Sequence, residues 1–94
     1  MEFEWDEAKA RSNLKKHGIP FEYATAVSDD PLRFETPDLD GEYDEERWLT
    51  VGLAEGDELA VISTTRGTKT RLISARRATS YERGEYWENR YLHS

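Results

Sequence analysis

Residues 59–77, with the sequence LAVISTTRGTKTRLISARR, decide the fold. Two runs rich in β-forming residues, 59–64 and 70–76, flank a short turn at Arg66-Gly67, and this spacing predicts an antiparallel hairpin. The preceding run, 47–53, alternates apolar and polar residues and is followed by another glycine-containing turn. The three runs together predict an antiparallel β-meander.

The chain before and after the meander is predicted to be mostly helical. Asp6 is suited to cap a helix over residues 6–17, and Gly18 is suited to end it. Apolar residues recur at helical spacing in a second helix, which begins near Pro20 and ends near residues 29–31. The sequence Thr79-Ser80-Tyr81-Glu82 has the form of a capping box and predicts a terminal helix.

Residues 3–5 are predicted to form a short strand, and residues 35–46 an acidic loop without periodicity. This order of elements is typical of an α+β fold. We expect the helices to pack on one face of the sheet and the other face to stay partly open. The length predicts a single domain over residues 1–94.

The composition excludes several kinds of protein and site. There is no cysteine, which excludes disulfides and thiolate metal ligands. The longest apolar run, residues 59–62, is far shorter than the roughly 20 residues that span a bilayer. The first residues lack the basic start and apolar stretch of a signal peptide, so we expect a cytoplasmic protein that does not contact membranes.

The net charge is −7, but the charges are unevenly distributed. Residues 29–46 contain nine acidic residues and a single basic one. Residues 66–77 contain five basic residues and no acidic one, namely Arg66, Lys69, Arg71, Arg76 and Arg77. The sequence therefore predicts an acidic loop and a basic strand edge. The alternative is an ordinary solvated surface.

The end of the third strand is a candidate phosphate site. Strand alternation points Ile73 and Ala75 to the core and Ser74 and Arg76 to the open face. A guanidinium can bind two phosphate oxygens at once and stays charged. The alternative is that Arg76 and Arg77 pair with carboxylates of residues 29–46 and only hold the loop.

The two histidines are His17 and His93. His17 is a candidate general acid or base, because imidazole titrates near neutral pH, although a cation at the negative end of the first helix is the simpler interpretation. The two histidines are far apart, and the acidic loop lacks a calcium-binding pattern. No metal site and no cofactor are therefore predicted.

Several segments, in order through most of the chain, carry a family resemblance. They are FEWD (3–6), NLKKHGI (13–19), FE (21–22) with Ala24, DDP (29–31), ERW (46–48), VG (51–52) and RLISARRAT (71–79), followed by Glu82 and Tyr86. With these segments the chain resembles the BrnT family, the toxin half of a bacterial type II toxin–antitoxin pair. The resemblance implies a RelE-like fold and a ribonuclease that inhibits translation.

The resemblance also implies a partner and a site. The partner would be a BrnA-like antitoxin of the ribbon-helix-helix class, which masks the toxin and alone contacts operator DNA. The reaction would be the metal-independent attack of an RNA 2′-OH on the adjacent phosphate. Arg66 and Arg76 would stabilise the phosphorane, and His17 would transfer protons. The residues implied to position the RNA backbone are Lys69, Arg71 and Arg77. Glu82 is a candidate base, although capping the terminal helix is its simpler role.

The chain departs from the family pattern in two respects. Pro20 stands where the family often has a serine that caps the second helix, which would soften the start of that helix. The acidic balance is unusual for a protein that holds RNA by phosphate contacts. The alternative function is therefore a non-catalytic module that acts only as antitoxin partner and co-repressor. We expect the antitoxin to cover the basic edge, with residues 29–46 as a competing occupant.

Overall fold

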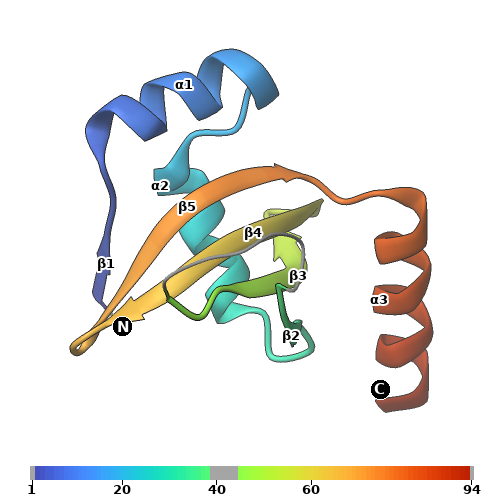
Figure 1. Ribbon diagram of the computed structural model, residues 1–94. Helices are drawn as coiled ribbons and strands as arrows, with labels where there is room; N and C mark the ends of the chain where they lie inside the picture. Colours follow the sequence, from blue (N-terminus) through green and yellow to red (C-terminus); the bar gives the residue numbers. More distant parts are fainter. Residues whose placement is uncertain (1, 39–44, 94) are drawn as a thin grey trace.

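The computed structural model describes residues 2–38 and 45–93, which form a five-stranded sheet flanked by helices (Figure 1). The elements are β1 (Glu2–Glu4), α1 (Glu7–His17), α2 (Phe21–Ala24), the 3-10 helix η1 (Thr25–Asp29), β2 (Phe34–Pro37), β3 (Trp48–Ala54), β4 (Asp57–Arg66), β5 (Lys69–Arg77) and α3 (Ser80–His93). The α+β class predicted from the sequence is confirmed.

The strands follow one another across the sheet in the order β1-β5-β4-β3-β2. Each of the strands β2 to β5 pairs antiparallel with the next, whereas β1 runs parallel to β5. The turn between β3 and β4 places Glu55 at φ 48° and Gly56 at φ 88°. Two successive positive φ angles are typical of the type I′ turn, whose twist matches that of a hairpin.

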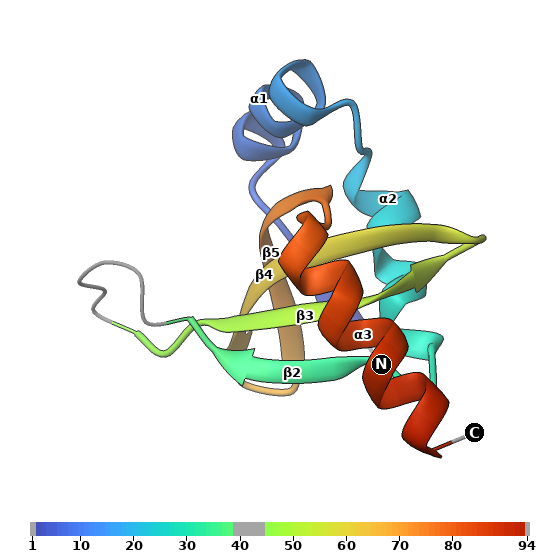
Figure 2. The same cartoon turned by 90° about the vertical axis from the view of Figure 1, so that its right-hand side faces the viewer.

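Each face of the sheet has its own helical cover. The helices α1, α2 and η1 cover one face, called here the α2 face, and α3 packs on the other, called the α3 face; Figure 2 shows α3 in front of the sheet. The core of the α2 face consists of Ile19, Phe21, Ala24, Val27, Ala54, Leu59, Val61, Leu72 and Ala75. The core of the α3 face consists of Val51, Ala60, Ala78 and Tyr86.

The expectation that the helices pack on one face of the sheet is therefore wrong. Leu59, Ala60 and Val61 are consecutive in β4 and all buried, so this strand is apolar on both faces. An apolar strip on each face needs its own cover. Tyr86 of α3 provides that cover over Ala60, on the side away from α2.

A β-bulge in β5 changes which residues reach the core. The register with β4 shifts between Ser74 and Leu72, which leaves Ile73 without a partner. Leu72 and Ala75 are three positions apart and would face opposite sides of a regular strand, but because of the bulge they lie in the same core. The prediction that Ala75 is buried is confirmed, and the prediction that Ile73 lies in the core is wrong.

The acidic loop predicted over residues 35–46 begins with a strand instead. Phe34 pairs with Val51 and Pro37 with Trp48, so β2 extends the sheet at its edge. Proline is tolerated there because an edge strand needs no donor on its outer side. Residues 39–44 of the expected loop lie outside the described residues.

The predicted caps of α1 are confirmed. Asp6 Oδ1 accepts hydrogen bonds from the backbone N–H groups of Ala8 and Lys9, and Gly18 ends the helix at φ 72°. The helix docks through a polar residue, because Asn13 is its one buried side chain, whereas Leu14 is 47% exposed. The second helix is short, and Pro20 gives it no side-chain cap, as its departure from the family pattern suggested.

Candidate functional site

Four of the predicted basic residues lie in a row on the α3 face. In the register of β4 and β5, Arg66 pairs with Lys69, Thr64 with Arg71 and Ala60 with Arg76. Because positions two apart share a face and Ala60 belongs to the core under α3, all these cations project on that side. We call Arg66, Lys69, Arg71 and Arg76 the basic track.

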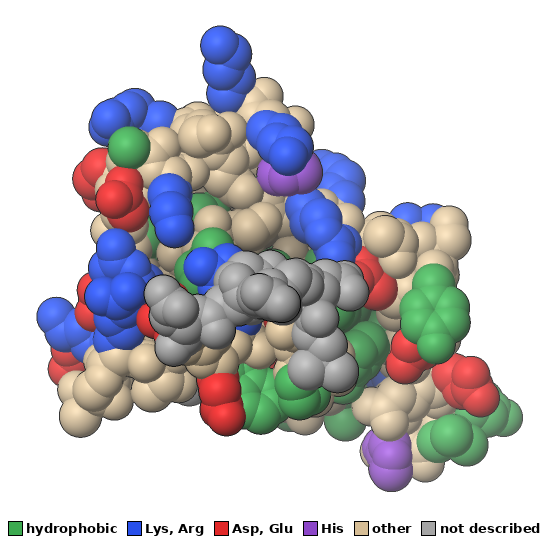
Figure 3. Space-filling model, in the orientation of Figure 1, with side chains coloured by type: hydrophobic (Ala, Val, Ile, Leu, Met, Phe, Trp, Pro, Cys, Tyr) green, Lys and Arg blue, Asp and Glu red, His purple; other side chains and the backbone are tan. Residues whose placement is uncertain are grey.

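The basic track is long rather than convergent. Ala60, the register partner of Arg76, and Arg66 are six residues apart in β4, which corresponds to about 20 Å. The structure thus places Arg66 and Arg76 on one face but at opposite ends of the hairpin. Figure 3 shows Lys and Arg side chains distributed over α1 and along this side of the sheet.

Carboxylates of the same chain accompany the arginines of the track. Glu45 lies 3.5 Å from Arg66, Glu4 lies 2.6 Å from Arg71, and Glu82 lies 2.7 Å from Arg76. All three pairs retain solvent contact on both partners. The pair of Arg66 and Glu45 is exposed and contributes about 0–1 kcal/mol, so a phosphate can compete for Arg66. The other two pairs are partly buried, and Glu82 is only 9% exposed.

The pair of Arg76 and Glu82 is joined by two hydrogen bonds. Arg76 donates from Nη1 and Nη2 to the two carboxylate oxygens, at 2.7 and 3.0 Å. Glu82 also accepts the N–H of Thr79 and donates its own N–H to the Thr79 hydroxyl, which completes the predicted capping box. The hydrogen bond from Arg76 lowers the pKa of Glu82, against the opposing effect of burial. A carboxylate so occupied is a poor proton acceptor, which favours the capping role over the role of base.

Arg76 keeps donors for a ligand. Among the described residues, its hydrogen bonds go to Glu82 and, more weakly, to the carbonyl oxygen of Arg77 at 3.4 Å. A guanidinium has five N–H groups, so the Nε–H group and one Nη2–H group remain. The hydrogen bond to Glu82 also raises the pKa of Arg76 and keeps it charged.

His17 lines a pocket that adjoins the track. Its pocket has a volume of about 260 Å³ and lies between the last turns of α1 and the bulge of β5. The lining residues are Lys9, Ser12, Asn13, Lys16, His17, Ile73 and Ser74. Ser74 joins the two regions, because it lines this pocket and precedes Arg76 by two residues on the same face. The structure therefore brings His17 near the Arg76 end of the track and leaves Arg66 at the far end.

Arg77 lies apart from the other predicted cations. It pairs in register with Leu59, whose side chain is in the core of the α2 face, and its guanidinium is 3.5 Å from Asp57. Asp57 accepts a hydrogen bond from Tyr23, and this bond raises the pKa of Tyr23 to about 12. Among the described residues, Arg76 and Arg77 thus form their ion pairs with Glu82 and Asp57, which lie outside residues 29–46, while the charge of Asp38 in that segment adds to the rise in the pKa of Arg76 that the hydrogen bond to Glu82 causes. It is Arg66 that pairs with a residue of that segment, Glu45.

The sequence contained a signal for the His17 pocket that was missed. Lys9, Ser12, Asn13 and Lys16 recur at helical spacing and form a polar stripe on α1. An apolar stripe on a helix would pack against the sheet and fill the space between them. The polar stripe of α1 instead lines an open pocket there.

Within residues 2–38 and 45–93, no three His, Asp or Glu side chains are grouped so as to hold a metal ion. No helix in this part of the chain is both long and apolar enough to cross a membrane.

The sequence was compared with known proteins. None of the curated proteins matches it significantly. Residues 5–82 match the family described as ribonuclease toxin, BrnT, of type II toxin–antitoxin systems. The match runs from the end of β1 to the capping glutamate of α3 and so includes the basic track, the His17 pocket and the bulge. The chain belongs to the BrnT family of ribonuclease toxins.

Proposed function

We propose that the protein is a metal-independent endoribonuclease that inhibits translation in the cytoplasm until a cognate antitoxin neutralises it. The observation that carries this proposal is the continuity of the basic track with the His17 pocket at Arg76 and Ser74. A row of cations can hold a strand of phosphates, and a histidine at its end can move protons.

The proposed reaction is an internal transfer within the RNA. The 2′-oxygen loses its proton and attacks the adjacent phosphorus, and the bond from phosphorus to the 5′-oxygen of the next nucleotide breaks. The products are a cyclic phosphate and a free 5′-OH. Arg76 would stabilise the charge that develops on the phosphorane, and His17 would exchange the protons.

The remaining track residues would hold the RNA on either side of the cut. Lys69 and Arg71 would bind phosphates, and Arg66 would act at the end of the track rather than on the same phosphorus as Arg76, because about 20 Å separates them. Arg77 would contribute only if the RNA also reached the α2 face. The fold of the family would be RelE-like.

The partner would be a BrnA-like antitoxin of the ribbon-helix-helix class, laid over the basic track. Its acidic residues would replace the phosphates of RNA, and charge complementarity would speed the encounter. Operator DNA would be contacted through the antitoxin.

A second candidate function is a non-catalytic antitoxin partner and co-repressor. The observation that favours it is that Arg66, Arg71 and Arg76 already have carboxylate partners in the chain, whose net charge is −7.

Expression of the protein without an antitoxin separates the two functions. The proposed nuclease arrests growth, and total RNA acquires new ends with cyclic phosphate and 5′-OH groups. Purified protein cleaves RNA equally well in EDTA and in Mg²⁺. Cleavage that requires Mg²⁺ would overturn the metal-independent mechanism, and unchanged growth with intact RNA would favour the second candidate.

A further inference from the structure

The α2 face contains a cleft that the proposed reaction does not use. It has a volume of about 340 Å³ and is lined by one residue of η1 and by residues of the strands β2 to β5. The lining residues are Ser28, Glu35, Trp48, Thr50, Ser63, Thr65 and Thr70, which we call the hydroxyl cleft. Its volume is in the range of small-ligand sites, about 300–1,000 Å³.

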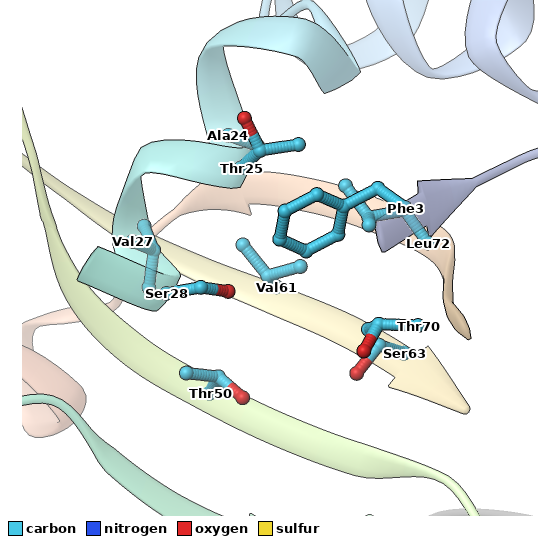
Figure 4. Close-up of a pocket in the computed structure, with 10 residues that line it drawn as sticks. All are labelled: Phe3, Ala24, Thr25, Val27, Ser28, Thr50, Val61, Ser63, Thr70 and Leu72. Atoms are coloured by element: carbon cyan, nitrogen blue, oxygen red, sulfur yellow. The ribbon is translucent and has the colours of Figure 1, made fainter. Parts of the chain in front are cut away.

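The five hydroxyl groups of this cleft are not used to hold the fold. Thr50 and Ser63 are each 8% exposed, and Figure 4 shows them, with Ser28, around the space under η1. None of the five donates or accepts a hydrogen bond within the described part of the chain, whereas the Thr25 and Thr64 hydroxyls each bond a backbone carbonyl. These hydroxyls are not among the fully buried atoms of the described residues that have no partner, so they face the solvent in the cleft, where they can bond a ligand.

The chemistry of the lining selects a neutral, flat ligand. Among the described residues, no Lys, Arg or His side chain lines the cleft, and its carboxylate, Glu35, forms an ion pair with Arg33 at 3.0 Å. The indole of Trp48 offers an aromatic surface. Val61 and Leu72 line an adjoining pocket, shown in Figure 4, which shares Ser28, Thr50, Ser63 and Thr70 with the cleft. A nucleobase combines a stacking surface with donors and acceptors on its edge.

The cleft adjoins one end of the basic track. Thr65 and Thr70 pair across the hairpin, and the next pair, Arg66 with Lys69, points to the opposite face. A two-residue turn after Arg66 ends the hairpin, so the end of the track and Thr65 and Thr70 of the cleft lie at the same tip, on opposite faces. Arg66 is about half exposed, and its contact with Glu45 is a long one at 3.5 Å.

We propose that the hydroxyl cleft binds one unpaired base of single-stranded RNA, with the phosphate of that nucleotide held at the hairpin tip by Arg66 and Lys69. The cleft would recognise a base outside the cut site and so contribute to the choice of target. This inference rests on the proposed ribonuclease function for its RNA ligand. The proposed base site and the proposed site of cleavage lie on opposite faces of the sheet.

The experiment is a titration of the ¹⁵N-labelled protein with adenosine, guanosine, cytidine and uridine and with their 5′-monophosphates. We expect at least one base to shift the amide signals of Thr50, Ser63, Thr65 and Thr70. The monophosphate should bind more tightly than its nucleoside, and Lys69→Gln should remove that difference. Shifts confined to the basic track, or no shift at all, would overturn the proposal.

Matched variants test the hydroxyl groups. Thr50→Val with Ser63→Ala should weaken nucleoside binding by about ten-fold, since each substitution removes a hydroxyl that would hydrogen-bond the base. Thr36→Val serves as control, because this threonine is on the α3 side of β2, next to Glu35. If the double variant does not fold, the single change Ser63→Ala gives the same comparison. Equal affinity in the variants and the wild type would contradict the proposal.

Cleavage of total RNA, measured in parallel, separates this proposal from the proposed function. If the protein binds nucleosides but cleaves no RNA, the base-binding proposal is supported and the proposed ribonuclease function is contradicted. If the protein cleaves RNA but no nucleoside shifts the amide signals of the cleft, the ribonuclease function is supported and the base-binding proposal is contradicted. Signals in the cleft that respond to the antitoxin but to no nucleoside would identify a protein-binding surface and overturn the assignment to a base.

Discussion

Asn13 and Ala75 exchange two hydrogen bonds across the interface of α1 and β5. Asn13 Nδ2 donates to the carbonyl oxygen of Ala75 at 2.8 Å, and the Ala75 N–H donates to Asn13 Oδ1 at 3.1 Å. The strand β1 pairs with β5 only at residues 69–71, so the Asn13 side chain replaces a neighbouring strand further along. This contact fixes the helix that carries His17 against the strand that carries Arg76.

We expect Asn13→Ala to lower the free energy of unfolding by about 2–3 kcal/mol, because it leaves the N–H and carbonyl groups of Ala75 buried without partners. Asn13→Asp should be similarly destabilising, since it removes both donated bonds and places a carboxylate against the carbonyls of Ala75 and Ile19. Urea unfolding measures the change, with Ser12→Ala as control. A loss equal to that of the control would show that the contact is dispensable.

Arg76→Ala should reduce RNA cleavage by more than about ten-fold, since loss of a contact to a developing charge removes about 2–4 kcal/mol of transition-state stabilisation. The fold should persist, because Glu82 keeps its capping bonds with Thr79. Single-turnover cleavage and a circular dichroism spectrum measure the two effects. Arg11→Ala is the control, an exposed cation of α1 outside the track. An unfolded variant would mean that Arg76 is chiefly a structural ion-pair partner.

The buried carboxylate of Asp30 should make stability depend on pH in the acid range. Burial alone would raise the pKa of Asp30, but hydrogen bonds from the Tyr86 hydroxyl and two backbone N–H groups outweigh it and lower this pKa. A lowered pKa in the folded state gives stability that is fully present above the ordinary pKa of an aspartate. It is lost as the pH falls through the lowered value.

The test compares Asp30→Asn with the wild type in urea at several pH values from neutral down to the acid range. The variant should be less stable at neutral pH by about 1–3 kcal/mol, because an amide cannot accept all these bonds. It should also lose less stability on acidification. Asp29→Asn, at the neighbouring position, is the control. Equal pH dependence in Asp30→Asn and the wild type would contradict the assignment.

Arg71→Glu should slow association with the antitoxin at low salt. The substitution reverses a charge in the middle of the basic track and places it beside Glu4, so it weakens long-range attraction of an acidic partner. Stopped-flow association rates at two salt concentrations measure the effect.

Deleting residues 38–44 tests the competing occupant: if that segment masks the track, the free protein should cleave RNA faster after the deletion. An association rate unchanged by Arg71→Glu and insensitive to salt would exclude electrostatic docking on the track.

Local sequence signals predicted the elements of the fold well, and long-range pairing explains what they missed. The cap at Asp6 and the box at Thr79 and Glu82 act within a few residues, so their patterns are visible in the sequence. The bulge at Ile73 depends on the register with β4, which strand alternation alone does not reveal. The strand β2 was missed because its four residues include a proline and gain their stability from β3.

For the candidate site, too, local patterns could be predicted and long-range contacts could not. Strand alternation correctly placed Ala75 in the core, and in the structure Arg76 lies on the opposite side of β5. The partners of the arginines were not predictable from local pattern, since Glu4 is 67 positions from Arg71. Asn13 was passed over because a polar residue on a helix is usually exposed, whereas here it is the docking residue.

If the track binds RNA as proposed, its ion pairs would also determine how many dissolved ions take part in the binding. A strand of RNA normally sheds condensed counterions in proportion to the cations it meets, which makes affinity fall steeply with salt. Here Arg66, Arg71 and Arg76 each already hold a carboxylate of the chain. When a phosphate replaces one of these, the protein's own carboxylate is released and must recruit a cation from solution. The exchange takes back part of the entropy gained from the RNA's ion atmosphere. The affinity of this acidic chain for RNA would then be lower than that of a row of unpaired arginines, and it would fall less steeply with salt concentration.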